Sequence, residues 1–188
     1  WQAKLAGNDA IFDTTYSLAS LLRASMGNTD PYITVSQELS YIRDYIQIQK
    51  ARFRDKIQAN IAVEPALMPV MIPKLILQPI VENALLHGIM MKEEKKGTIL
   101  LTGWREENDI VFVISDDGAG IPPEKLDSLL DERTQAAVGS SSRHVGVSNT
   151  NLRLKSLYGS GYGLSFTSVP GQGTEVTVRI PAQEEEEF

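Results

Sequence analysis

The stretch that most constrains the fold is ISDDGAGI, at residues 114–121. A run of apolar residues reaches Asp116, and two glycines, Gly118 and Gly120, follow before Ile121. A carboxylate at the end of a buried strand is costly unless a donor contacts it, and the exocyclic amine of adenine is such a donor. Glycine lets the backbone approach a flat ligand where a Cβ atom would collide. Clusters of Asp and Gly also form ordinary turns, so the rest of the chain must decide between a turn and a site.

Three other segments accompany this stretch. QPIVENALLHG at 78–88 precedes it, and HVGVSNTNLRL at 144–154 and GQGT at 171–174 follow it. In this order the four segments resemble the N, G1, G2 and G3 boxes of the GHKL ATPase superfamily, which has the Bergerat nucleotide-binding fold. With YIQIQKARF at 45–53, the pattern resembles more narrowly the LytS/YesM-type sensor histidine kinases. The resemblance extends over about residues 15–181.

The segment at 78–88 lies on a helix that we predict over residues 74–88. Asn83 and His87 are four residues apart and therefore share a helix face. Such a pair could be a satisfied polar edge of a core helix. The resemblance implies instead that Asn83 gives its amide oxygen to Mg²⁺, a hard cation that takes oxygen ligands together with nucleotide phosphates. It also implies that His87 lines the nucleotide pocket.

The resemblance assigns the adenine pocket to the other boxes. Asp116 is expected to accept a hydrogen bond from the adenine amine. The floor of the pocket is expected to consist of the residues that follow it, Gly118, Gly120 and Ile121. Thr174, just after Gly171 and Gly173, resembles the family threonine that helps to hold adenine, often through water. The alternative is a β-branched strand residue after a tight turn.

Residues 132–151 resemble the lid that covers the phosphates of ATP. Gly146 frees the backbone there, and we predict a helix over 147–158 whose N-terminus can face an anionic phosphate. The resemblance adds Asn149 and Arg153 to the nucleotide-binding residues. Arg153 could reach a phosphate or lie in solvent as an ordinary helix arginine.

The chain departs from the family pattern at two positions. Leu86 stands where many histidine kinases have a phosphate-binding lysine, and His144 replaces the first glycine of the G2 box. These departures leave open an alternative function, a non-catalytic nucleotide-binding or scaffold module.

A further alternative is a GHKL-type ATPase. Several relatives hydrolyse ATP with a glutamate four residues before the metal asparagine, but Pro79 occupies that position and cannot act as a base. Glu82 is about 100° around the helix from Asn83. Phosphoryl transfer needs mainly positioning and charge neutralisation, which favours a kinase. The two histidines, His87 and His144, both belong to nucleotide boxes, so the resemblance places the phosphoacceptor histidine on a helix outside this chain.

The resemblance implies the remaining partners and the setting. They are the histidine-bearing upstream helix, the receiver domain of a response regulator and a second copy of the full-length protein. It also implies a cytoplasmic domain of a protein in the bacterial cell membrane. The net charge of −6 argues against a nucleic-acid surface. The chain has no cysteine, and none of its apolar runs is long enough to span a membrane. Because it begins at Trp1, we expect an excised piece of a longer protein.

The hydrophobic pattern predicts an α/β two-layer sandwich with a mixed, mostly antiparallel sheet, preceded by helices, and the resemblance implies that this sandwich is of the Bergerat type. A helix is expected at 10–27, and a second at 35–54 begins at a capping box formed by Thr34 and Gln37. The second helix is apolar on more than one side, which indicates a helical bundle. The resemblance implies that residues 1–55 are the remnant of a dimerisation and phosphotransfer bundle and that residues 56–182 are the ATP-binding domain. Residues 183–188 are expected to be an acidic tail. Strands are expected at 57–63, 97–104, 109–115, 162–168 and 174–180.

Overall fold

A five-stranded sheet forms one layer of the molecule. The structure, a computed structural model, describes residues 30–53, 56–124, 126 and 145–182. The strands lie in the order β2 (Ile57–Val63), β4 (Gly97–Glu106), β5 (Asp109–Asp116), β7 (Gly173–Pro181) and β6 (Gly163–Val169). β2 pairs with β4 in parallel, and the other pairs are antiparallel. The predicted mixed, mostly antiparallel sheet is therefore confirmed.

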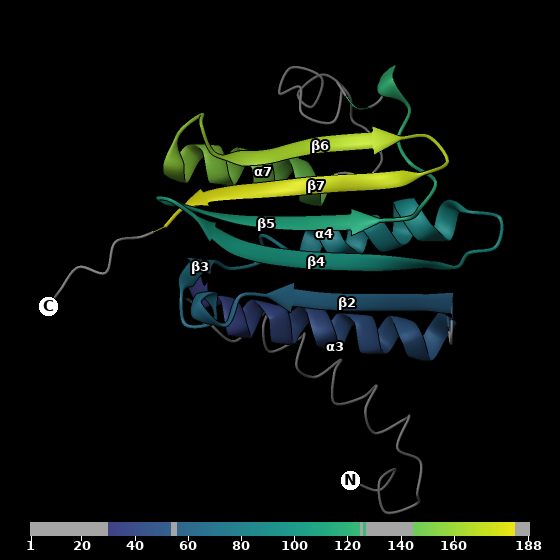
Figure 1. The fold of residues 1–188 in the computed structure, drawn as a ribbon, viewed down its shortest axis with the longest axis horizontal. Coiled ribbons are helices and arrows are strands. Elements are labelled where there is room, and N and C mark those ends of the chain that lie inside the picture. The colour runs from purple at the N-terminus through teal and green to yellow at the C-terminus, as the bar shows by residue number, and fades with distance from the viewer. Residues whose placement is uncertain (1–29, 54–55, 125, 127–144, 183–188) are drawn as a thin grey trace, which may run out of the picture.

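Helices form the second layer on one side of this sheet (Figure 1). α3 (Val35–Phe53) runs beside β2, and α4 (Gln78–Asn83) and α7 (Val145–Tyr158) lie behind the central and last strands. α4 contacts both α3 and α7. A small antiparallel sheet of β1 (Tyr32–Thr34) and β3 (Met71–Pro73) closes one end of the helical layer.

The strand pattern follows from burial. β2 and β6 form the edges of the sheet, and buried residues alternate with exposed or half-buried ones along β7 and much of β4. In β5 the residues Ile110, Val111 and Phe112 are buried in succession, which is expected of a strand with neighbours on both sides. The continuous apolar run that predicted a central strand is thus confirmed.

α3 packs against the same core as the sheet. Buried side chains of this helix, Val35, Leu39, Ile42, Tyr45 and Ile46, belong to the same hydrophobic core as the sheet. An amphipathic pattern shows that a helix is covered but does not show what covers it. The boundary at residue 56 stays a prediction, and we propose as an alternative that the α/β domain includes α3. The predicted helix at 10–27 and the acidic tail lie outside the described residues.

The predicted helix at 74–88 was wrong in its start and its regularity. Residues 71–73 form β3, and Leu75 has a φ of 59°, which no right-handed helix contains. α4 is only six residues long, with Pro79 in its first turn, where the missing N–H costs nothing. A π turn over Ala84–Gly88 follows it.

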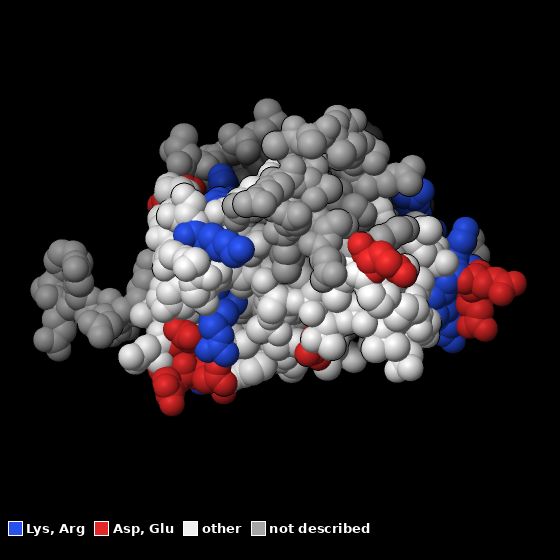
Figure 2. Space-filling model, turned by 90° about the horizontal axis from the view of Figure 1, so that it is seen from above, with Lys and Arg blue, Asp and Glu red and all other residues white. Residues whose placement is uncertain are grey.

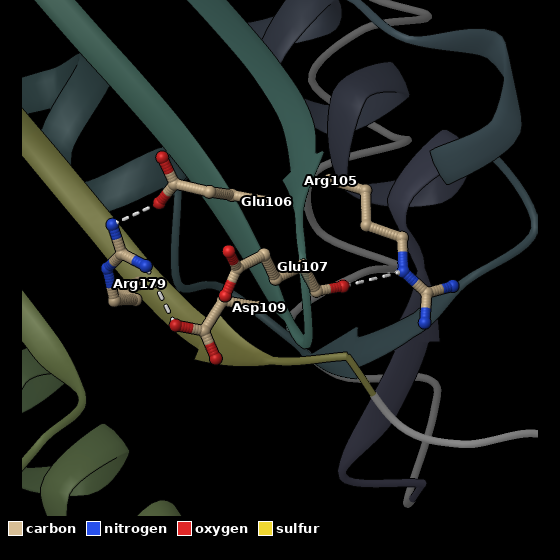
Figure 3. A network of polar contacts seen from close by, with 5 residues as sticks. All are labelled: Arg105, Glu106, Glu107, Asp109 and Arg179. Carbon is tan, nitrogen blue, oxygen red and sulfur yellow. Dashed lines mark hydrogen bonds and ion pairs between the residues drawn. The ribbon is translucent and has the colours of Figure 1, made fainter.

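The far end of the sheet carries a polar network (Figure 3). Arg179 of β7 binds both Glu106 and Asp109 across the β4–β5 turn, with 2.7 Å between its Nη1 and Asp109 Oδ2. Beside it, Arg105 Nε donates to the carbonyl oxygen of Glu107 at 3.3 Å.

Figure 2 shows acidic and basic side chains gathered at the two ends of one face, with mostly uncharged described surface between them. Among the described residues, no helix is long and apolar enough to cross a membrane.

Candidate nucleotide-binding site

Asp116 ends the central strand β5 and lies between two neighbouring strands. It is paired with Ile99 of β4 on one side and with Thr174 of β7 on the other. Its side chain is 9% exposed, and Oδ1 accepts the N–H of Gly118 at 2.8 Å. Burial raises the pKa of Asp116 to about 6 from an ordinary 3.8; the N–H of Gly118 opposes this rise and the charge of Asp117 adds to it. A carboxylate in this environment has much to gain from a donor.

The loop after Asp116 is locked against the end of the N box. A Cβ atom on Gly118 would lie 2.3 Å from the carbonyl carbon of Gly88, and one on Gly88 would lie 2.4 Å from Asp116 Oδ1. Ala119 N–H donates to the Gly88 carbonyl oxygen at 3.1 Å. From the sequence alone, we expected these glycines to allow the close approach of a ligand. In the structure, the close neighbours that require them are atoms of the protein itself.

The G3 turn is joined to the same loop. Gly120 has a φ of +69°, and a Cβ atom there would lie 2.1 Å from the last carbonyl oxygen of β6. Gly173 has a φ of +119°, and a Cβ atom there would lie 1.9 Å from the Asp116 carbonyl oxygen. Gly171 N–H donates to the Ala119 carbonyl oxygen at 2.7 Å. The predicted G1 and G3 glycines therefore lie together and fix the backbone around Asp116.

A serine that sequence analysis missed connects Thr174 to Ile121. Ser168 Oγ accepts the N–H of Ile121 at 2.8 Å and donates to the Gly173 carbonyl oxygen at 2.9 Å. It also lies 2.9 Å from Thr174 Oγ1. Since the single hydroxyl proton of Ser168 is used on Gly173, Thr174 donates in that contact. Thr174, 7% exposed, is held beside Asp116 with lone pairs left to accept. Ser168 lies on β6, outside the four boxes, so no sequence motif could have revealed it.

The N box brings Asn83 and His87 to the same end of the helical layer. Asn83 is the last residue of α4 and is half-buried, and His87 is half-buried within the π turn. A π turn has i→i+5 bonds and takes more residues per turn than an α-helix. Asn83 and His87 therefore lie in consecutive elements, and the expectation that they share one face stays a prediction. Leu86, at the position of the family lysine, is 41% exposed.

The G2 box differs from its predicted form. Gly146 lies in the first turn of α7, which begins at Val145, and a Cβ atom there would only touch Pro79 Cβ at 3.5 Å. Thus Gly146 is a helical residue rather than a loop hinge. Asn149 is exposed on the same helix. The earlier part of the predicted lid, 132–144, lies outside the described residues.

Arg153 is exposed on α7 and makes a hydrogen bond to the backbone of another segment. Its Nη2 donates to the carbonyl oxygen of Lys74, in the turn that precedes α4. Because Arg153 is exposed on α7, the choice between a phosphate contact and a solvated helix arginine stays a prediction. The phosphate contact would require Arg153 to leave this carbonyl.

Two acidic residues near the boxes have structural partners. Asp117 Oδ1 accepts the N–H of Thr98 at 2.9 Å, and Lys92 Nζ lies 3.7 Å from the same oxygen. Glu82 accepts a hydrogen bond from Gln78 Nε2 at 2.8 Å. Its charge, after burial, also helps to raise the pKa of Tyr45 on α3. Glu82 thus interacts with α3 and the start of α4.

The same segments match a known family. The histidine kinase-, DNA gyrase B- and HSP90-like ATPase family matches residues 71–184, which include the four boxes. The chain belongs to this family. Residues 1–57 match a second family, described as histidine kinase. The ATPase-family region thus holds Asn83, Asp116 and Thr174, and the LytS-type resemblance is confirmed.

Relatives of known name support the narrower assignment. The chain is 27% identical to the sensor histidine kinase BtsS of Escherichia coli K12, over 89% of the chain and 27% of that protein. It is 27% identical to the sensor histidine kinase/phosphatase LytS of Staphylococcus aureus Mu50, over 95% of the chain and 30% of that protein. The chain therefore spans less than a third of the length of these relatives.

Solved structures share the fold. The histidine kinase domain of the blue-light activated histidine kinase of Erythrobacter litoralis EL346 has a TM-score of 0.57 at 20% identity, covering 95% of this chain and 82% of that one. The catalytic domain of histidine kinase ThkA has a TM-score of 0.61 at 13% identity, covering 81% of this chain and 97% of that one. These likenesses confirm the histidine kinase ATPase fold.

Proposed function

We propose that this chain is the catalytic ATP-binding part of a two-component sensor histidine kinase. It binds Mg²⁺–ATP and transfers the γ-phosphoryl group to a histidine outside residues 1–188, for relay to a response regulator. The observation that carries the proposal is Asp116. It is a buried carboxylate of raised pKa at the central strand end, beside Thr174 and enclosed by the N and G3 boxes of a family-matched region.

Adenine recognition follows from this arrangement. The carboxylate of Asp116 accepts from the exocyclic amine, and Thr174 has the lone pairs to accept through water. The rigid glycine loop fixes both acceptors before the ligand arrives, so little conformational entropy is lost on binding.

Mg²⁺ fits the residues at the end of α4. Asn83 presents an amide oxygen on a half-buried residue, and Mg²⁺ takes one or two protein oxygens beside phosphates and waters. When bound, Mg²⁺ neutralises charge on the transferred phosphoryl group. We infer that Asn83 holds the metal, that His87 lines the pocket, and that Asn149 and Arg153 serve the phosphates once Arg153 leaves Lys74.

Kinase chemistry is favoured over ATP hydrolysis. Pro79 stands at the position of the ATPase glutamate, and Glu82 is engaged with Gln78. Neither provides a general base for water. By the same inference the full-length protein is a membrane-bound homodimer that presents this domain to the cytoplasm and a receiver domain.

Nucleotide titrations test the metal role. We expect Asn83→Ala to lose most of the Mg²⁺ dependence of ADP affinity while metal-free binding changes little. Asn60→Ala, an exposed asparagine on the edge strand β2, is the matched control and should behave as wild type. If Asn83→Ala responds to Mg²⁺ as wild type does, Asn83 is structural only.

Incubation with γ-labelled ATP tests the transfer. This chain alone should remain unlabelled, and a chain extended upstream through a histidine-bearing helix should acquire an acid-labile, base-stable label, because transfer depends on positioning the acceptor. Stable label on His87 or His144 would contradict our placement of the acceptor. An extended chain that binds ATP but transfers nothing would favour the nucleotide-binding scaffold. The exposed Leu86, which stands in place of the phosphate-binding lysine of many histidine kinases, would be consistent with that function.

A further inference from the structure

Glu38 is a fully buried carboxylate that none of the four boxes contains. It lies in the first turn of α3 and is 0% exposed. Burying a carboxylate so completely is costly unless hydrogen bonds compensate. The capping box at the start of α3 does not involve it: Thr34 and Gln37 cap that helix by themselves, at 2.9 and 3.2 Å. Its partners lie elsewhere in the chain.

Those partners are backbone N–H groups at the start of the N box. Glu38 Oε2 accepts from Leu75 N–H at 2.7 Å, and Oε1 accepts from Leu77 N–H at 3.0 Å and Gln78 N–H at 3.3 Å. Burial raises the pKa of Glu38, and the N–H groups of Leu77, Leu75 and Gln78 oppose that rise. The turn curls around the carboxylate, with Leu75 in the left-handed region at a φ of 59°.

Glu38 completes the hydrogen bonding at the N-terminus of α4. A helix start leaves unpaired N–H groups, and no side chain from within α4 or its N-cap Leu77 caps it. Gln78 N–H is taken by Glu38, Pro79 has none, and Ile80 N–H donates to the Leu77 carbonyl oxygen at 3.1 Å. A carboxylate forty residues earlier in sequence therefore supplies the cap that the local sequence lacks.

The position of Asn83 depends on this cap. α4 has six residues, too few to be stable as an isolated helix. Asn83 lies at its last residue, less than two turns from the capped end. The other end continues into the π turn and stops at Gly88, which is locked against Asp116 and Gly118. The helix is thus held at both ends, by α3 on one side and by the adenine loop on the other.

We propose that Glu38 is a positioning residue for the nucleotide site, which fixes the N-box helix so that the Asn83 amide meets the metal. This inference rests on the proposed function. Its structural part, that the Glu38 carboxylate holds the start of α4, can be measured without a nucleotide.

Glu38→Gln is the sharpest perturbation because it keeps the size of the side chain. The substitution replaces one carboxyl oxygen by an amide NH₂ group, which cannot accept a hydrogen bond and would face a backbone N–H. This loss of an acceptor occurs whether the wild-type carboxyl is ionised or neutral. We expect amide hydrogen exchange at Leu75, Leu77 and Gln78, and along 83–88, to become about tenfold faster in nucleotide-free protein, relative to amides of β7. Gln37→Ala, which removes a cap of α3 one residue away, should not change exchange in α4.

Binding then tests the positioning role. The Mg²⁺-dependent part of ADP affinity should fall by about tenfold in Glu38→Gln, the lower end of the loss seen when groups that orient metal ligands are removed. The metal-free part should change less. Ile110→Ala, in the core at the far end of β5, controls for loss of stability and should keep the wild-type Mg²⁺ response. If Glu38→Gln folds poorly, Glu38→Asp should show the same order of effects.

The outcomes separate the two proposals. The positioning role of Glu38 is overturned if amide exchange in Glu38→Gln is faster by the same factor along the whole chain. It is also overturned if exchange is faster only near α4 but the Mg²⁺ dependence of ADP affinity equals that of wild type. If wild type binds no Mg²⁺–ADP, the proposed function fails, whereas the exchange pattern still decides whether Glu38 holds the helix.

Discussion

The raised pKa of Asp116 makes adenine recognition dependent on pH. The carboxyl titrates at about 6 in the nucleotide-free protein, and only its ionised form is a pure acceptor for the adenine amine. Binding therefore favours the ionised form and releases a proton from any Asp116 that carries one. The affinity should rise as pH rises through 6 and level off above about pH 7.

The size of the effect follows from the ionised fraction. With a pKa of about 6, about nine-tenths of Asp116 is ionised at pH 7 and about one-tenth at pH 5. At pH 8, Asp116→Asn should lose about 1.5–3 kcal/mol, the worth of a charge-assisted hydrogen bond, which is about tenfold to a hundredfold in affinity. The ratio of wild-type to Asp116→Asn affinity should shrink by about tenfold between pH 7 and pH 5.

Calorimetric titration with ADP at several pH values measures this ratio. The nucleotide phosphates also titrate in this range, but they do so equally with both proteins and cancel in the ratio. Repeating the titration in buffers of different ionisation enthalpy reports the released proton directly. A ratio that stays constant from pH 5 to pH 8 would refute the role of the Asp116 carboxylate.

The same pKa has an opposite consequence for stability. Because the folded pKa of about 6 exceeds the ordinary 3.8, the folded protein binds the proton more tightly than the unfolded chain does. The contribution of Asp116 to the free energy of unfolding is therefore full below pH 3.8 and is lost as pH rises through 6, by at most about 3 kcal/mol. Asp116→Asn should be more resistant to urea than wild type at pH 8, and at pH 4 the difference should vanish. Equal resistance of the two proteins at pH 8 would contradict this reasoning.

Three substitutions test the packing around the site. Gly118→Ala should unfold or severely destabilise the chain, by about 3 kcal/mol or more in a chemical melt, because its Cβ atom would lie 2.3 Å from the Gly88 carbonyl carbon. Gly146→Ala should instead stabilise the chain by about 0.5–1 kcal/mol, since its Cβ atom would meet Pro79 at a normal 3.5 Å within a helix; a loss in thermal melting would contradict its helical position. Arg179→Ala should cost about 1 kcal/mol or less despite its two ion pairs, because the side chain is 40% exposed, and ADP affinity should not change.

Strand positions could be predicted because apolar and polar residues alternate along most of the strands and because β5 contains a continuous apolar run. The five predicted strands agree with β2, β4, β5, β6 and β7 to within two residues at each end. The four boxes also predicted which residues meet: Asp116, Gly118, Gly173 and Thr174 lie together although they come from two distant segments. A motif preserves the residues that a close approach requires, so it reports contacts that local periodicity cannot.

The failures have a different physical origin. The turn before α4 depends on Glu38, and nothing in residues 70–80 shows that a carboxylate will take their N–H groups. The apolar stripes of α3 predicted that the helix is covered but not which element covers it, because either a sheet or a second helix can cover such a stripe. The hydrogen bond of Arg153 to the Lys74 carbonyl oxygen could not be predicted, because the two residues are 79 positions apart in the sequence. Each of these features is determined by a partner from another part of the sequence.

The π turn at Ala84–Gly88 limits how the length of the N box can change. A π turn is equivalent to an α-helix with one residue inserted, and here the added length carries Gly88 to the point where it packs against Asp116. Deleting one residue between Asn83 and Gly88 would restore a regular helix but would withdraw Gly88 from that contact. A sequence alignment that places a single gap in this segment would therefore align residues that have different neighbours in the structure, although the residue types on either side of the gap still match.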